Sequence, residues 1–197
     1  MLRRRLAAQL GRPTGAFGRV VAAALNRGNR PANRRAVELL GVEPGQRALD
    51  VGFGGGVGLA ALLAAGAGTV AGVEVSSDMV ARARRRFGER VDARDGSVES
   101  IPFPDASFDR VLTVHTIYFW PDAAAGAREL LRVIAPGGRL VVAFMRGEEM
   151  RKQKIHEHGF SFYEAADVAA LLTGAGFAPV RVEGDGPLFA VAEKPAG

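Results

Sequence analysis

The chain of 197 residues lacks cysteine altogether and contains only three lysines, two tyrosines and one tryptophan. Without cysteine there are no disulfides, no thiolate metal sites and no cysteine nucleophile, so any catalysis must use other side chains. No apolar run approaches the roughly 18 residues that a membrane span needs. The N-terminus also lacks the long apolar stretch of a secretory signal. We therefore expect a cytoplasmic protein.

Acidic side chains are missing from residues 1–35, which carry nine arginines. The other residues hold 17 basic and 21 acidic side chains, so this arm accounts for the net charge of +5. Such an arm suits an anionic lipid surface, nucleic acid or an acidic substrate, but an arginine-rich protein can also carry these charges on a solvated helix face. Because the basic charge is confined to the arm, the sequence argues against a nucleic-acid substrate.

The rest of the composition is that of an ordinary globular protein, with 48% hydrophobic and 24% charged residues. A chain of this length forms one well-packed domain and is too short for two. We expect residues 1–35 to form a basic helical cap, or lid, over a domain of residues 36–197. In the cap, one helical face is apolar and carries Phe17, Val20, Val21, Ala24 and Leu25.

Short apolar runs alternate with longer stretches of helical spacing, the pattern of a parallel sheet wrapped by helices. The runs predict strands over 47–52, 69–75, 90–95, 108–115, 138–144, 179–184 and 188–194. The helical stretches are 58–66, 77–88, 123–138 and 164–177. We expect the second of these helices to begin at a Ser77/Asp78 cap and the third to end at Pro136 and Gly137. The tight turn between the last two strands makes them antiparallel.

The segment LDVGFGGGVG, residues 49–58, joins the first strand to the following helix. Glycine in such a turn tolerates a positive φ and lets a ligand approach the main chain without a Cβ in the way. The free N–H groups at the start of the helix favour an anionic group. Glu74, at the end of the next strand, stands where a doubly wound sheet presents an acid to ribose hydroxyls. These features predict a nucleoside ligand with an anionic end.

The glycine segment resembles the first motif of the class I S-adenosylmethionine-dependent methyltransferases, an acidic residue followed by Gly-x-Gly-x-Gly. The group it resembles within them is the small-molecule group called type 11 or UbiE-like. Later motifs of the family resemble, in the same order, GVEVSSDMVARARRR, ARDGSVESIPFPDASFDRVLTVHTIYFWPD, ELLRVIAPGGRLVVAF and GFSFYEAADVAALLTGAGFAPVRV. The resemblance covers residues 36–194. It implies a three-layer, doubly wound, Rossmann-like α/β fold whose seven-stranded sheet has the order 3-2-1-4-5-7-6, with the last strand antiparallel.

The resemblance also implies S-adenosyl-L-methionine as cofactor and S-adenosyl-L-homocysteine as product. By resemblance, Glu74 takes the ribose hydroxyls, while Asp50 and the glycine turn meet the amino-acid end. Each acid has a structural alternative, since Glu74 can cap a helix or pair with a cation and Asp50 can tie down nearby backbone. The implied cofactor residues are Asp50, Gly52, Gly54, Gly56, Glu74, Val75, Met79, Asp95, Gly96, Ser97 and Val114.

Methyl transfer is an in-line displacement, which gains most from alignment and from the exclusion of water. In this family the segment TVHTIYFWPD, residues 113–122, faces the methyl group. His115 is the candidate general base because its ordinary pKa is close to neutrality. Tyr118 is the second catalytic candidate. The alternative for both residues is that their rings only shape the pocket. Of the aromatic residues Tyr118, Phe119 and Trp120, we expect two to pack internally. The candidate substrate-binding residues are Phe17, His115, Tyr118, Trp120 and His158.

Several features narrow the chemistry without naming the acceptor. His156 and His158 flank a glutamate at a spacing that zinc does not favour, so we expect no metal site. The Asn/Asp-Pro-Pro-aromatic sequence used on planar exocyclic amines is missing after the fourth strand. We expect a small-molecule acceptor, with a membrane-borne lipid or isoprenoid, docked through the basic arm, as the alternative. A nicotinamide-dependent oxidoreductase and a non-catalytic binding module are more remote. The acceptor atom, the need for a base, and the choice between monomer and homodimer stay open.

Overall fold

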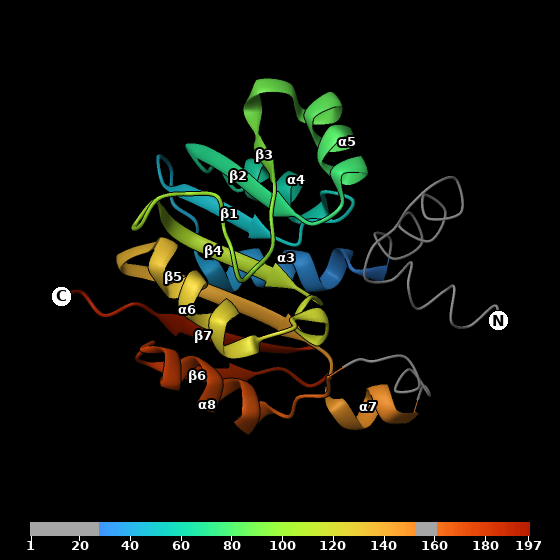
Figure 1. Cartoon of the computed structure of the whole chain (residues 1–197), viewed down its shortest axis with the longest axis vertical. Coiled ribbons are helices and arrows are strands. Elements are labelled where there is room, and N and C mark those ends of the chain that lie inside the picture. Colours follow the sequence, from blue (N-terminus) through green and yellow to red (C-terminus); the bar gives the residue numbers. More distant parts are fainter. Residues whose placement is uncertain (1–27, 153–160) are drawn as a thin grey trace.

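The structure is a computed structural model that describes residues 28–152 and 161–197 (Figure 1). In these ranges seven strands form one mixed sheet in the order β3-β2-β1-β4-β5-β7-β6, with β7 antiparallel to both neighbours. The predicted fold class, strand order and antiparallel last strand are confirmed. The strands are β1 (Arg47–Val51), β2 (Thr69–Glu74), β3 (Asp92–Asp95), β4 (Phe108–Val114), β5 (Ile134–Phe144), β6 (Val180–Glu183) and β7 (Leu188–Glu193).

Helices cover both faces of the sheet and complete the three layers (Figure 1). On one face the core includes side chains of α3 (Arg30–Leu40), α4 (Val57–Ala64) and α5 (Ser77–Phe87). On the other face it includes side chains of α6 (Ala123–Val133) and α8 (Ala165–Ala175). Short helical turns lie in the connections: η1 (Gly88–Arg90), η2 (Ile117–Phe119) and α7 (Gly147–Lys152).

The first strand shows how the alternation of side chains positions the site. In β1, Ala48 packs into the core on the α3 and α4 side, and Leu49 packs into the core on the α6 and α8 side. Successive side chains of a strand point to opposite faces, so Asp50 shares the side of Ala48. This alternation turns its carboxylate toward α3 and α4, at the end of the strand where the glycine turn begins.

Two predicted element boundaries are wrong. The helix predicted over 123–138 ends at Val133, because Ile134 is extended and pairs with Phe108 of β4, so β5 begins there. Pro136 and Gly137 therefore lie within the strand, where the pairing register shifts, and they do not end the helix. The N-cap of α5 is Ser76, one residue before the predicted Ser77/Asp78 cap.

Of the predicted cap, residues 1–35, the structure describes only residues 28–35. Residues 1–27 lie outside the described ranges, and α3 runs from Arg30 to Leu40 as one helix across the proposed boundary at residue 35. Of the helices in the described ranges, none has both the length and the apolar character that crossing a membrane requires.

The site lies where the parallel strands end. β1 pairs with β2 on one side and with β4 on the other, so the chain order reverses direction across the sheet at β1. In open parallel sheets, ligands bind in the crevice at the carboxyl ends of the strands beside this reversal. The loops after β1, β2, β3 and β4 all open there.

Candidate functional site

The turn between β1 and α4 needs glycine for two reasons. Gly52, Gly54 and Gly56 have φ values of 75°, 49° and 75°, in the left-handed region that other residues rarely adopt. A Cβ on Gly52 would lie 2.5 Å from the Thr116 side chain, and one on Gly56 would lie 2.9 Å from the Phe87 ring. The turn is therefore a bare stretch of main chain that leads into α4, with Gly56 as the N-cap of that helix.

Glu74 ends β2 and holds the glycine turn in place. Its carboxylate accepts hydrogen bonds from the backbone N–H of Gly54 at 2.9 Å and of Ser76 at 3.0 Å. The side chain is only 6% exposed, and burial raises its pKa although the backbone hydrogen bonds act in the opposite direction. One acid thus connects the turn after β1 with the turn after β2.

Asp50 lies beside Glu74 on the neighbouring strand and is 3% exposed. Burial, followed by the negative charge of Glu74, raises the pKa of Asp50 to about 8, while the backbone N–H of Leu59 lowers it. Two buried carboxylates therefore meet at one end of the site, where the cost of holding two negative charges is high.

Helix α3 and its N-cap contribute two amides that the sequence analysis missed. Asn33 is 6% exposed, and its Nδ2 donates to the backbone oxygen of Asn29 at 2.9 Å. Both asparagines line the same cavity as Asp50. Their spacing of four residues would have placed them on one face of a helix, but neither belongs to a motif of the predicted family.

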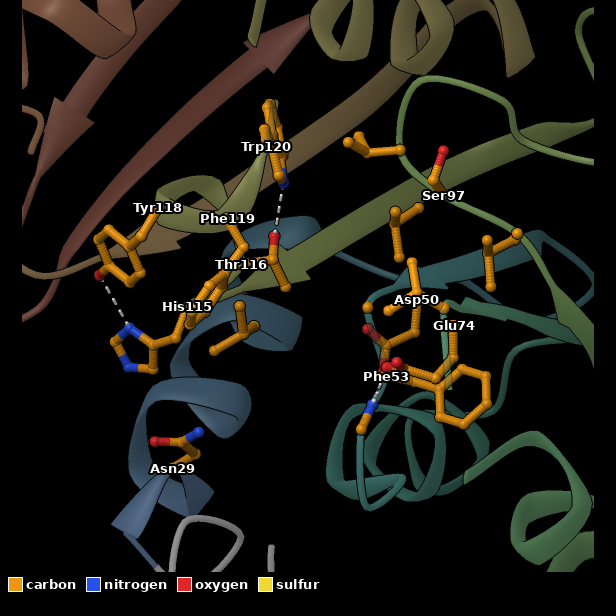
Figure 2. A pocket seen from close by; sticks show the side chains of 18 of the residues that line it. Asn29, Asp50, Phe53, Glu74, Ser97, His115, Thr116, Tyr118, Phe119 and Trp120 are labelled. Carbon is orange, nitrogen blue, oxygen red and sulfur yellow. Dashed lines mark hydrogen bonds between the residues drawn. The ribbon is translucent and has the colours of Figure 1, made fainter. Parts of the chain in front are cut away.

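One cavity of about 430 Å³ joins these groups to the predicted acceptor region. Figure 2 shows Asp50, Phe53 and Glu74 on one side of it and His115 and Tyr118 on the other. The predicted residues that line the cavity are Asp50, Gly52, Gly54, Glu74, Val75, Gly96, Ser97, Val114, His115, Tyr118 and Trp120. Residues that line it without having been singled out include Asn29, Asn33, Phe53, Glu99, Thr116, Met145 and Met150.

Three predicted cofactor residues do not line the cavity. Met79 is buried in the core beneath it, Gly56 packs against Phe87, and Asp95 is exposed at the end of β3. Two predicted substrate residues, Phe17 and His158, lie outside the described residues, as does His156. Of the aromatic cluster, Tyr118 and Trp120 are buried and Phe119 is 38% exposed, which confirms that two of the three pack internally.

His115 follows β4 with a φ of 58°, an uncommon conformation for a residue with a side chain. Its backbone N–H donates to the oxygen of Ala143 at 2.8 Å, and its Nδ1 lies 3.3 Å from the Tyr118 hydroxyl (Figure 2). Burial lowers the pKa of His115, so the ring is neutral at pH 7. Burial also raises the pKa of Tyr118, whose oxygen accepts a hydrogen bond from the Met145 backbone. The pair is uncharged.

Thr116 connects this pair to the glycine turn. The indole N–H of Trp120 donates to Oγ1 of Thr116 at 3.1 Å (Figure 2). An indole can only donate, so Oγ1 of Thr116 is the acceptor in this bond, and the same hydroxyl also forms a hydrogen bond with the Thr113 hydroxyl. The methyl group of the same threonine packs over Gly52. Within the two described ranges, no three acidic or histidine side chains are grouped so as to hold a metal ion.

Comparison with known proteins adds sequence relatives. Residues 49–142 match the family described as Methyltransferase domain. An uncharacterized methyltransferase of Bacillus subtilis is 30% identical over 122 residues, which are 61% of this chain and 67% of that protein. A demethylmenaquinone methyltransferase of Beutenbergia cavernae is 39% identical over 110 residues, 56% of this chain and 45% of the relative. A 27-O-demethylrifamycin SV methyltransferase of Amycolatopsis mediterranei is 33% identical, and 42% of it is covered. The chain thus spans less than half the length of two of these three relatives.

Solved structures share the fold. A Thermotoga maritima protein described as an S-adenosylmethionine-dependent methyltransferase, possibly for histamine, superposes with a TM-score of 0.72 at 26% identity, over 87% of this chain and 92% of that one. Phosphoethanolamine N-methyltransferase 2 of Haemonchus contortus, in complex with S-adenosyl-L-methionine, superposes with a TM-score of 0.73 at 19% identity. The superposition covers 84% of this chain and 52% of that one. At that lower identity the likeness concerns the fold alone.

Proposed function

Because the chain belongs to the family of S-adenosylmethionine-dependent methyltransferases, we propose that it transfers the methyl group to a small, largely apolar acceptor bound beside His115. The observation that carries this proposal is the single cavity, which has the glycine turn and two carboxylates at one end and a neutral histidine, aromatic rings and methionines at the other.

The residues at the first end suit the cofactor. The bare main chain of the glycine turn leaves room that a Cβ would fill, and its helix start favours a carboxylate. We assign Glu74 to the ribose hydroxyls, Asp50 to the ammonium group, and Gly96 and Ser97 to the adenine edge, with Val75 against its ring. When bound, the cofactor supplies an electrophilic methyl group on a cationic sulfur, which needs no phosphate-binding lysine.

The residues at the second end suit acceptor binding and proton removal. Tyr118, Trp120, Met145 and Met150 are apolar or neutral walls that align an acceptor and exclude water. His115 is neutral and therefore able to take a proton from an acceptor hydroxyl. We assign His115 as the general base and Tyr118 as the residue that orients its ring.

The N-terminal residues complete the proposal. We place a basic helical cap at residues 1–35 and the cofactor-binding domain at residues 36–197, with Phe17 and His158 on the substrate side. In the described part, Asn29, the N-cap of α3, lines the cavity. A cap in this place would shield the acceptor from water, which methyl transfer requires.

A calorimetric titration with S-adenosylhomocysteine tests the cofactor site, with NAD as the control ligand. We expect the wild-type protein to bind S-adenosylhomocysteine and not NAD. The Glu74→Ala variant should lose at least tenfold in affinity, because both the ribose contact and the hold on Gly54 disappear. Glu43→Ala, an exposed acid away from the cavity, should bind like the wild type. Binding of NAD and not of S-adenosylhomocysteine would overturn the proposed cofactor and favour the oxidoreductase alternative.

A turnover assay with and without lipid vesicles separates the two acceptor classes. Formation of S-adenosylhomocysteine with soluble aromatic or polyketide hydroxyl compounds, unchanged by vesicles, supports the small-molecule acceptor. Turnover that occurs only on vesicles would instead support the lipid or isoprenoid alternative.

A further inference from the structure

Two oxygen atoms from different elements approach one point above the first turn of α4. A Cβ built on Gly58 would lie 2.3 Å from Oδ2 of Asp50 and 2.9 Å from Oδ1 of Asn33. Asn33 belongs to α3 and Asp50 to β1, and both line the cavity. The amide orientation of Asn33 is set by its Nδ2, which donates to the backbone oxygen of Asn29. Its Oδ1, a hydrogen-bond acceptor, is therefore the atom left near the carboxylate.

The charged groups around Asp50 do not neutralise it. The charge that acts on it is that of Glu74 on β2, another acid, and α4 carries no charged residue. The backbone N–H of Leu59 is its one stabilising partner among the causes that shift its pKa. His115, after β4, is neutral. The other charged residues of α3 and α5 are exposed: Arg30, Arg34, Arg35, Glu38, Asp78, Arg82, Arg84, Arg85 and Arg86.

We propose that Asn33 and Asp50 together hold the primary ammonium group of the ligand, and that this ammonium replaces a proton that Asp50 carries in the free protein. The assignment rests on the proposed function. It adds Asn33, a residue outside every predicted motif, and the replacement of the Asp50 proton by the ammonium group. The O–H bond of Asp50 breaks, its proton passes to solvent, and N–H groups of the ligand donate to Asp50 and to Oδ1 of Asn33. The charge of this corner is the same before and after.

Physical chemistry favours this exchange. A buried carboxylate without a nearby cation is more stable in its neutral form, and a neutral carboxyl can donate to an amide oxygen where an ionised one can only accept. The raised pKa of Asp50 agrees with this state in the free protein. An ammonium group brings three donors and a positive charge, which two neighbouring acceptors can share.

The experiment compares two ligands that differ at this corner. S-adenosylhomocysteine carries the amino-acid portion, and 5′-methylthioadenosine carries the same nucleoside and sulfur without it. Calorimetric titrations at pH 7 in phosphate and in Tris give the number of protons released per ligand, because the two buffers have different heats of ionisation. Both ligands carry the ribose, so any proton that Glu74 releases on ribose binding is released with both. The difference in proton release between the two ligands therefore reports on Asp50.

We expect close to one more proton to be released with S-adenosylhomocysteine than with 5′-methylthioadenosine. Asp50→Asn should abolish this difference, and Glu43→Gln should retain it. Asn33→Leu should weaken the binding of S-adenosylhomocysteine about tenfold and change the binding of 5′-methylthioadenosine less than threefold. A merely structural role of Asn33 would weaken the binding of both ligands alike.

Equal proton release by the two ligands, or equal weakening of both by Asn33→Leu, would overturn this assignment while leaving the proposed function intact. If the wild-type protein bound neither ligand, the proposed function itself would fall, and this assignment with it.

Discussion

The hydrogen bond between His115 and Tyr118 decides which ring nitrogen of the proposed base is free. The contact of 3.3 Å joins Nδ1 to the phenol, so Nε2 is the nitrogen left for an acceptor. To serve as a base, Nε2 must carry a lone pair, which requires that Nδ1 holds the hydrogen and donates it to the Tyr118 oxygen. The same oxygen accepts from the Met145 backbone, which holds the ring of Tyr118 in place.

The pH dependence of turnover tests the role of His115. Burial lowers the pKa of His115, so the base should be active throughout the neutral range, and kcat should fall only as the pH drops below about 6.5. His115→Asn should lower kcat at saturating cofactor by about 100-fold and remove this acidic limb. Tyr118→Phe should keep the limb and lower kcat by about tenfold, since the ring is less well oriented. An acidic limb that survives in His115→Asn would show that another group is the base.

Asp50 should make the free protein less stable as the pH rises. Its pKa is near 3.8 in the unfolded chain and about 8 in the fold, so its ionisation costs stability over that interval. Below about pH 4 the group is neutral in both states, and the cost is absent.

Urea unfolding of Asp50→Asn measures this cost. We expect the variant and the wild type to have similar unfolding free energies at pH 4.5, and the variant to be more stable by about 1–3 kcal/mol at pH 8.5. A gap of the opposite sign at high pH would mean that the carboxylate is stabilised by the fold.

At the scale of the element, α4 depends on glycine where it passes Asp50. Gly58 lies in the first turn of the helix, and its φ is not in the left-handed region, so its backbone would accept alanine. The space is occupied, however, by the Asp50 and Asn33 oxygens. The helix can therefore approach β1 and α3 this closely only because the residue has no Cβ.

A matched pair of substitutions tests this. Gly58→Ala should lower the free energy of unfolding by about 1–3 kcal/mol and abolish S-adenosylhomocysteine binding, because the new methyl group displaces Asp50. Gly174→Ala, in α8 with no atom within 4 Å of its added Cβ, should raise stability by about 0.5–1 kcal/mol through helix propensity and leave binding unchanged. Thermal unfolding with and without ligand gives both quantities, and a neutral Gly58→Ala would contradict the close packing.

At the scale of the whole molecule, charge is segregated along the chain. The nine arginines of residues 1–35 stand against a remainder with more acids than bases. Attraction of such an arm to an anionic surface is screened by salt over about 10 Å at 0.1 M ionic strength.

Vesicle sedimentation tests the arm directly. If the arm docks on membranes, the full chain should sediment with anionic phospholipid vesicles at low salt and release several-fold at 0.5 M salt, whereas neutral vesicles should bind little. A chain lacking residues 1–14, which removes four arginines, should bind more weakly. Equal sedimentation with and without these residues would count against docking through the arm.

Local patterns in the sequence were enough to predict the α/β fold class and a nucleoside site, and the resemblance to the methyltransferase family supplied the strand order and the cofactor. Short apolar runs mark buried strands, a glycine turn allows left-handed backbone, and an acid that ends the second strand falls at a known edge of the sheet, all within a few consecutive residues. Where neighbouring strands override local signals the prediction was wrong, as at Pro136, which lies in β5 because Ile134 pairs with Phe108.

Only the tertiary structure brought α3 against β1, because contacts between residues 33 and 50 leave no periodic trace in the sequence. It also decided that Met79 packs into the core while Phe53 lines the cavity. The sequence determined which groups are available, since composition and spacing are local properties. Their protonation depends on burial and on neighbours from other elements, as with Asp50 beside Glu74, and so it was decided by the folded molecule alone.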